Sequence, residues 1–255
     1  MVYSLYRYRW LLYELVLRDI VLRYRGSVLG LAWTFLNPLL TMAVYTLVFS
    51  IYLRVGIPNY AVFLLSGLLP WLWFAGAISA GATSIVDGRM YVSRSVFSPI
   101  LLLLVPVCSQ AVNFLLSIPL FFGIAAIFGV HVGWPILVFP VLMGIQFLLV
   151  LGILMTLATL NVFFRDLQQL TATILSLLFY LAPIIYPLQS VPAAFRPFVF
   201  VNPMAALTIG YQDILFYDRL PSPVLTGYAF AVALVLCAIG RGVFNRYRDA
   251  FADYA

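Results

Sequence analysis

The sequence of 255 residues contains no lysine, one histidine and two cysteines. Without lysine the chain has no P-loop, because the lysine of that loop holds the β- and γ-phosphates of ATP. A single histidine, His131, leaves a zinc site or a histidine-based triad without enough ligands or partners. Cys108 and Cys237 lie in apolar runs, where free cysteine behaves as a small buried hydrophobe. We therefore expect no catalytic residue, no metal site and no cofactor on this chain.

Charge is also scarce. Only 9% of the residues are charged and 65% are hydrophobic, whereas soluble domains carry about 25% charged residues. No globular core hides that much apolar surface, so lipid is the expected solvent for most of the chain. The net charge of +6 comes from arginines that flank apolar runs, which indicates a membrane surface and not nucleic acid as the partner.

Uncharged stretches divide the chain into segments long enough to cross a membrane, which takes about 20 apolar residues. They cover residues 26–53, 55–86, 95–130, 132–164, 167–195 and 220–240. The fold prediction is therefore an all-α integral membrane protein with six transmembrane helices within residues 26–240. The spans carry essentially no ionisable residue, which argues against proton coupling, while sodium coupling through carbonyl and hydroxyl groups stays open.

The segment between spans five and six is apolar but not a simple span. Residues 198–216 are moderately hydrophobic, and charged residues cluster at their end. We expect short re-entrant helices here, and a plain external loop on the headgroups is the alternative. Asp213 and Asp218 are expected to be solvated ends of a short helix.

Residues 1–25 predict an amphipathic helix that lies on the inner membrane surface and leads into span one. The apolar residues that recur at helical spacing are Leu5, Tyr8, Leu12, Leu15 and Leu22. Glu14 with Arg18 and Asp19 with Arg23 have the spacing of ion pairs one turn apart. Residues 241–255 form a short basic tail.

The arginines set the orientation. With the N-terminus inside, eleven arginines lie on the inner side and three, Arg54, Arg196 and Arg219, lie outside. Arginine and lysine concentrate in cytoplasmic loops, so both termini are predicted in the cytoplasm.

Four local sequences stand out on this six-span pattern. They are LRYRGSVLGLAW at 22–33 continuing to LNPL at 36–39, SGLLPWLWF at 66–74, NVFFRDL at 161–167 and VNPM at 201–204. Together and in this order they resemble the ABC-2 family of exporter permeases, in its polysaccharide-exporting branch. The resemblance covers nearly the whole chain. Arg25 stands where the family often has lysine, and arginine keeps the charge.

The resemblance implies a single ABC-2 type transmembrane domain over residues 1–255 that acts as half of a transporter and is not itself an enzyme. A second copy would pair with it, and two cytoplasmic nucleotide-binding subunits would hold the ATP and Mg²⁺. The implied cargo is a lipid-linked polysaccharide of the O-antigen, capsule or teichoic acid type. The implied location is the bacterial cytoplasmic membrane, with membrane lipids as further partners.

The inner loop between spans two and three, residues 87–97, matches the family's coupling helix. The residues that would contact the ATPase subunit are Arg89, Tyr91, Arg94 and Phe97. A short helix with arginine and aromatic anchors fits a groove on a partner and moves as a lever. A simple positive-inside loop is the alternative.

The junction of the N-terminal helix and span one carries Arg23 and Arg25. They either hold the substrate pyrophosphate as it arrives from the inner leaflet or extend to the lipid headgroups. Small residues follow at Gly26, Gly30 and Ala32, and we expect them to allow close helix approach at a dimer interface.

Aromatic residues line the spans, and Tyr45, Tyr52 and Tyr180 are the candidates for a channel wall. Sugar rings have apolar faces that lie against aromatic rings, which suits a sliding polymer. Headgroup anchoring is the alternative for such rings.

Other functions stay open at this point. The alternatives are an ABC-2 permease for another lipid or a drug, a passive channel component, and a membrane enzyme that processes glycans. The RYRGS and FFRD sequences disfavour the drug permease. An enzyme needs acidic or metal-binding residues near a membrane face, and no convincing set is present.

Overall fold

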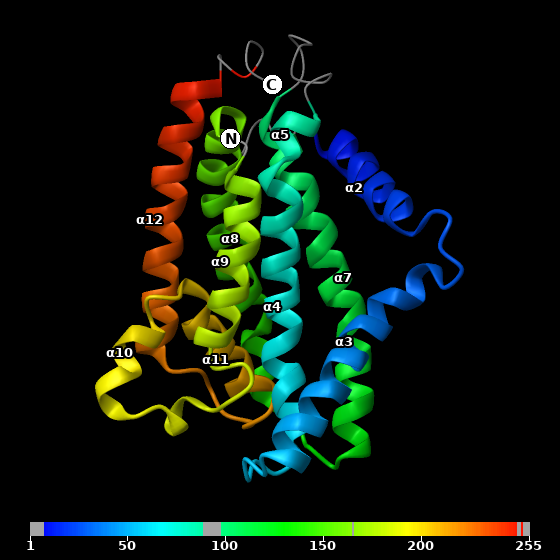
Figure 1. Ribbon diagram of the computed structural model, residues 1–255, viewed down its shortest axis with the longest axis vertical. Helices are drawn as coiled ribbons and strands as arrows, with labels where there is room; N and C mark the ends of the chain where they lie inside the picture. Colours follow the sequence, from blue (N-terminus) through cyan, green and yellow to red (C-terminus); the bar gives the residue numbers. More distant parts are fainter. Residues whose placement is uncertain (1–7, 89–97, 165, 249–250, 252–255) are drawn as a thin grey trace.

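The structure is a computed structural model that describes residues 8–88, 98–164, 166–248 and 251, and every regular element among them is helical (Figure 1). The α-helices are α2 Arg9–Tyr24, α3 Trp33–Tyr45, α4 Tyr60–Ala82, α5 Ser84–Asp87, α7 Ile100–Ile127, α8 Phe139–Phe163, α9 Leu167–Leu181, α10 Arg196–Val199, α11 Pro203–Leu215 and α12 Pro223–Tyr247. Short 3₁₀ turns occur at Gly30–Ala32, Trp134–Val138, Leu188–Ser190 and Ala193–Phe195, and a π-helical turn at Thr46–Tyr52. The predicted all-α fold is confirmed.

Within the described residues, five helical stretches are long and apolar enough to cross a membrane. They are Gly30–Tyr52, Tyr60–Ala82, Ile100–Ile127, Trp134–Phe163 and Pro223–Tyr247. A sixth candidate is the pair Ala193–Val199 and Pro203–Leu215, which is bent by 105° and has the form of a broken span or re-entrant loop. The last span continues as helix through Tyr247, beyond the predicted end at residue 240, because a helix that leaves the membrane no longer needs apolar side chains.

The predicted fifth span, residues 167–195, forms a helix only over Leu167–Leu181. At 1.5 Å per residue this helix is about 22 Å long, shorter than the hydrocarbon core of about 30 Å. It ends because Pro183 follows. The residue before a proline avoids the helical region, and Ala182 is extended, with φ −81° and ψ 144°.

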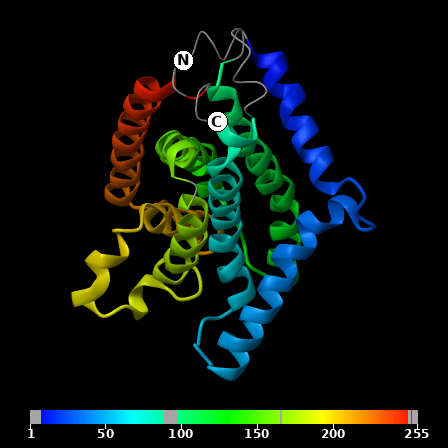
Figure 2. The same ribbon diagram turned by 45° about the horizontal axis from the view of Figure 1, so that its top comes forward.

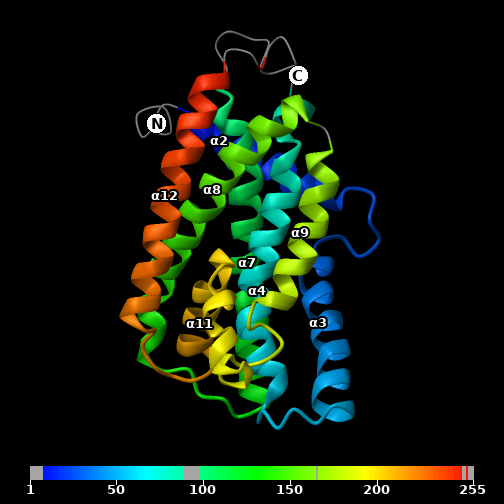
Figure 3. The ribbon, with the colours of Figure 1, turned by 60° about the vertical axis from the view of Figure 1, so that its left-hand side comes forward.

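Helix α4 occupies the centre of the bundle, with α7, α9, α11 and the lower part of α3 arranged around it (Figures 1 and 3). Its sequence is apolar on all sides, as expected of a helix that is mostly buried, and Leu72 and Ser79 are among its few exposed residues. It is the most deeply buried of the five candidate spans. Its residues Phe63, Leu65 and Phe74 are among the largest fully buried side chains. Helices α3, α7, α8, α9 and α11 pack directly on α4, whereas α12 packs on α8 and α11.

Helix α2 lies along α7, and the chain then turns through residues 25–29 into α3 (Figure 2). Gly26 and Gly30 adopt φ +79° and +48° at this turn, a region that side chains with Cβ rarely enter. A Cβ added at either glycine meets no atom within 4 Å. Within this chain the two glycines serve the turn, and their predicted contact at a dimer interface stays a prediction.

One of the two predicted ion pairs on α2 forms. Arg23 donates from Nη2 to Asp19 Oδ2 at 3.0 Å. Glu14 and Arg18 make no ion pair within 4.0 Å among the described residues, since both side chains are exposed and nothing holds them together.

Helices α8 and α12 meet through two glycines. A Cβ on Gly152 would lie 2.6 Å from the backbone nitrogen of Cys237, and a Cβ on Gly240 would run into the carbonyl oxygen of Gly152. Both neighbours are backbone, which cannot rotate away as a side chain does. The crossing therefore depends on the missing side chains, as in other close helix contacts in membranes.

We predict that Gly152→Ala separates α8 from α12 and lowers the free energy of unfolding by about 1–3 kcal/mol, the usual cost of overpacking. Thermal unfolding of the detergent-solubilised protein measures the loss. Gly144→Ala is the matched control on α8, because a Cβ there meets no atom within 4 Å. Equal melting temperatures for the two variants would contradict the close contact.

Candidate functional site: an aromatic groove along α4

A groove of about 430 Å³ runs between α3, α4 and α9. In Figure 1, α9 lies to the left of α4 and α3 lies mostly to its right. The residues that line the groove are Thr41, Tyr45, Leu68, Trp71, Leu72, Ala75, Ser79, Ala172, Leu175, Ser176, Phe179 and Tyr180. The lining is mostly apolar and aromatic with a few hydroxyl groups, which is the composition of sites that bind uncharged organic ligands.

The aromatic residues of the groove are in contact with one another. The ring of Phe179 lies 5.7 Å from Tyr45, 5.7 Å from Trp71 and 5.4 Å from Tyr180, measured between ring centroids. Rings at these distances and tilts stabilise each other, so together they form a packed aromatic wall of the groove. The hydroxyl groups of Thr41 and Ser79 also line the groove. The wall therefore offers ring faces for apolar surfaces and hydroxyls for hydrogen bonds, and none of its lining residues is charged.

The end of α9 fixes one side of the groove. After Leu181 the chain is not helical, and Ala182, Pro183, Ile184 and Ile185 are all buried. Backbone carbonyls in a buried, non-helical segment need donors, since neither water nor lipid supplies them here.

Buried side chains from other helices donate to these carbonyls. Gln212 Nε2 on α11 donates to the Pro183 oxygen at 2.7 Å, and the Tyr60 hydroxyl on α4 donates to the Ile185 oxygen at 2.9 Å. Asn202 Nδ2 donates at 2.8 Å to the Leu178 oxygen in the last turn of α9, which also accepts from the Ala182 nitrogen. Three donors from α4 and α11 thus hold the end of α9 in place.

Asn202 also begins α11. Its Oδ1 accepts from the backbone nitrogen of Met204 at 3.0 Å, an N-cap, and Pro203 takes the first helical position, where its missing N–H costs nothing. The VNPM sequence at 201–204 thus has two functions. It starts α11, and through Asn202 it binds the end of α9. These functions explain why this asparagine and proline stand together.

Gly67 on α4 leaves room for this junction. A Cβ there would lie 3.1 Å from the Thr208 side chain, 3.2 Å from Gln212 Nε2 and 3.6 Å from the Ile184 Cα. The SGLLPWLWF sequence at 66–74 therefore supplies both the gap for α11 and, through Trp71, part of the groove wall.

Residues 11–216 match the family model described as ABC-2 type transporter. The chain belongs to the ABC-2 type transporter family. It is a multi-pass membrane protein, and the apolar helices agree with that assignment. The family resemblance predicted from the four motifs is confirmed.

Two relatives cover almost all of this ABC-2 permease. It is 38% identical over 255 residues to the O-antigen export system permease protein RfbA of Myxococcus xanthus, covering 99% of this chain and 98% of the relative. It is 30% identical over 245 residues to a protein of the same description from Klebsiella pneumoniae, covering 92% and 91%. The similarity is therefore to whole permeases.

The structure brings two of the three candidate channel tyrosines together. Tyr45 and Tyr180 both line the groove of the permease. Tyr52 lies at the far end of the first span with 69% of its surface exposed and does not line the groove. The sequence did not point to Thr41, Ser79 and Ser176, although Ala172, Ser176 and Tyr180 recur every fourth residue on one face of α9.

Arg23 lines a second cavity, of about 440 Å³, between the α2–α3 turn and helices α4 and α7. Its pairing with Asp19 offsets its charge. Arg25 follows the end of α2 with an extended backbone and an exposed side chain. The proposed coupling residues Arg89, Tyr91, Arg94 and Phe97 lie outside the described residues, so the structure leaves their function as a prediction.

Asp213 lies in the last turn of α11 and is buried, so it is not the solvated helix end that the sequence suggested, whereas Asp218 is exposed. Asp213 is 3% exposed and pairs with Arg219, whose Nη2 and Nε lie 2.6 and 2.8 Å from its Oδ1. Asp218 accepts from the Gly133 backbone nitrogen at 2.8 Å and lies near His131. The sequence could not show this because the chain folds back on itself only after Asp213. Among the described residues no group of three potential metal ligands forms.

We predict that Gln212→Met lowers the free energy of unfolding by about 1–3 kcal/mol, because the change preserves bulk and removes the donor for the buried Pro183 carbonyl. Thermal unfolding in detergent measures the loss. Gln169→Met on the exposed face of α9 is the control. If the two variants have equal melting temperatures, this hydrogen bond does not stabilise the end of α9.

Proposed function

We propose that this ABC-2 permease is the membrane subunit of an exporter for a lipid-linked polysaccharide. Separate cytoplasmic ATPase subunits drive it, and a second copy completes the pathway. The groove of Tyr45, Trp71, Phe179 and Tyr180 supports the cargo class, because ring faces accept sugars without selecting one sugar. Whole-length similarity to permeases described as O-antigen exporters supports the same class.

The groove also argues against the alternative functions. Its lining residues include no carboxylate, histidine or cysteine, so a glycan-processing reaction finds no acid, base or metal ligand there. A permease for a drug or another lipid would share the fold. The similarity of nearly the whole chain to two O-antigen permeases favours the polysaccharide.

The proposed orientation places the end of the bundle where α7 starts and α12 ends in the cytoplasm, together with both termini, in the bacterial inner membrane. The distribution of eleven arginines against three supports it. In that orientation Arg23 and Arg25 lie where a lipid-linked pyrophosphate arrives from the inner leaflet, with headgroup anchoring as the alternative. Residues 87–97 would face the ATPase.

We predict that Tyr45→Ala and Tyr180→Ala each lower the rate of polysaccharide export about threefold to tenfold, the value of one ring contact. Export is measured as surface glycan in a strain that depends on this permease. Tyr52→Ala is the matched control, since Tyr52 lies outside the groove. A Tyr52 variant as defective as the other two, at equal protein levels, would reject the groove as the pathway.

We predict that Arg89→Ala or Tyr91→Ala uncouples ATP hydrolysis from export. The ATPase subunits would keep hydrolysing ATP, because the nucleotide site is on another chain, while export falls. Hydrolysis and export are measured together in proteoliposomes of the complex. Unchanged export in both variants would remove residues 87–97 as the coupling element.

A further inference from the structure

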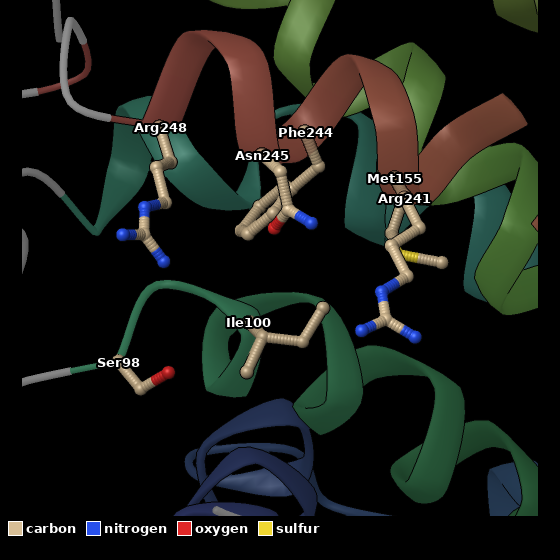
Figure 4. A pocket seen from close by; sticks show the side chains of 7 residues that line it. All are labelled: Ser98, Ile100, Met155, Arg241, Phe244, Asn245 and Arg248. Atoms are coloured by element: carbon tan, nitrogen blue, oxygen red, sulfur yellow. The ribbon is translucent and has the colours of Figure 1, made fainter. Parts of the chain in front are cut away.

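A third cavity lies at the opposite end of the bundle from the α3–α4 loop, apart from the aromatic groove and the cavity lined by Arg23. It has a volume of about 450 Å³ and lies between the start of α7, the middle of α8 and the end of α12 (Figure 4). We call it the α12 basic pocket. Its lining residues are Ser98, Ile100, Met155, Arg241, Phe244, Asn245 and Arg248.

The polar side chains of the α12 basic pocket come from the end of α12 on one side and from Ser98 on the other. Arg241, Asn245 and Arg248 follow one face of α12 at intervals of four and three residues. In Figure 4 both guanidinium groups extend from α12 toward the start of α7, and the Ser98 hydroxyl lies on the opposite side. Two guanidinium groups, an amide and a hydroxyl give the pocket many hydrogen-bond donors and two positive charges.

The charge of Arg241 is not balanced by the lining of the pocket. None of the seven lining residues is acidic. Arg241 makes no ion pair and no hydrogen bond with the part of the chain that the structure describes. A cation in this position favours an anionic ligand.

The floor of the pocket is apolar. Ile100, Met155 and Phe244 are 8%, 1% and 6% exposed. An apolar floor lowers the local dielectric, which strengthens the attraction between the arginines and an anion. Arginine is also the side chain whose planar fork matches phosphate oxygens two at a time.

The position of the pocket along α12 agrees with a phosphate ligand. The apolar run of the last span ends at Gly240, and Arg241 is the first charged residue after it. Lipid phosphates lie at that boundary between hydrocarbon and water. The same boundary is open to soluble phosphate.

We propose that the α12 basic pocket binds a phosphate group through Arg241, Arg248, Asn245 and Ser98. The phosphate is carried either by an anionic phospholipid or by a soluble ion. This site is independent of the proposed export function, because it needs only the described geometry and a membrane boundary at the end of α12.

The test uses the full-length protein purified in a neutral detergent. Dioctanoyl phosphatidylglycerol, dioctanoylglycerol without phosphate, and inorganic phosphate are titrated separately by calorimetry. The variants are Arg241→Gln and Arg248→Gln. Arg246→Gln is the matched control, because Arg246 lies on α12 with the same charge, over the Tyr247 ring at 6.0 Å and outside the pocket. Gel filtration and melting temperature confirm that each variant is folded.

We expect phosphatidylglycerol to bind and dioctanoylglycerol not to bind. Arg241→Gln and Arg248→Gln should each weaken the phosphate-bearing ligand about tenfold or more, the value of one charge-assisted hydrogen bond, and Arg246→Gln should leave it unchanged. Inorganic phosphate that binds with the same dependence identifies a soluble ligand, and binding of the phospholipid alone identifies the lipid.

Three results would overturn the proposal. Equal weakening by Arg246→Gln would mean that general positive charge, and not the pocket, attracts the lipid. If dioctanoylglycerol binds as tightly as phosphatidylglycerol, the phosphate group does not contribute to binding. Folded Arg241 and Arg248 variants that keep full lipid affinity but no longer bind the ATPase subunits would make the pocket a protein contact.

Discussion

Backbone carbonyls that lose their helical partners inside a membrane protein must find donors within the protein, and the end of α9 is where this permease meets that requirement. Pro183 stops the helix, and the next residues run through the interior without helical hydrogen bonds. Gln212 on α11 and Tyr60 on α4 satisfy the carbonyls of Pro183 and Ile185, and Asn202 adds a second hydrogen bond to the Leu178 carbonyl in the last turn of α9. Neither lipid nor bulk water offers a comparable substitute, so the position of α9 depends on these donors.

The hydrogen bonds at the end of α9 also affect the aromatic groove. Most of α4 is buried and α11 is bonded to the end of α9, so packing inside the bundle fixes Trp71 and Phe179 in the groove wall. Helices α3 and α9, which form the two flanks, have few buried residues of their own. The packed aromatic wall and the exposed surfaces of α3 and α9 are suited to binding a ligand, a lipid or a second copy of the chain.

Much of this arrangement could be predicted from local sequence and some could not. Long runs without charge located the spans. The Asn-Pro pair at 202–203 marks a helix start, because asparagine caps the helix and proline fits its first position. The length of α9 was misjudged because hydropathy does not register Pro183 as a break. Asp213 was misjudged because its partner Arg219 reaches it only after the chain turns at Tyr217 and Asp218. The positive φ values of Gly26 and Gly30 show a turn that the sequence interpretation did not include.

The sequence by itself determined that the chain enters a membrane as helices, that it lacks a P-loop of its own, and that its motifs belong to the ABC-2 type transporter family. These properties follow from composition, a missing residue type and local order, which do not depend on contacts between distant segments. Only the tertiary structure decided that Tyr45 and Tyr180 share a groove, that Tyr52 does not, and that Arg241 and Arg248 face Ser98 across a pocket. Side chains on different helices meet according to helix rotation and crossing, and those depend on packing around α4 and on the glycine contact between α8 and α12.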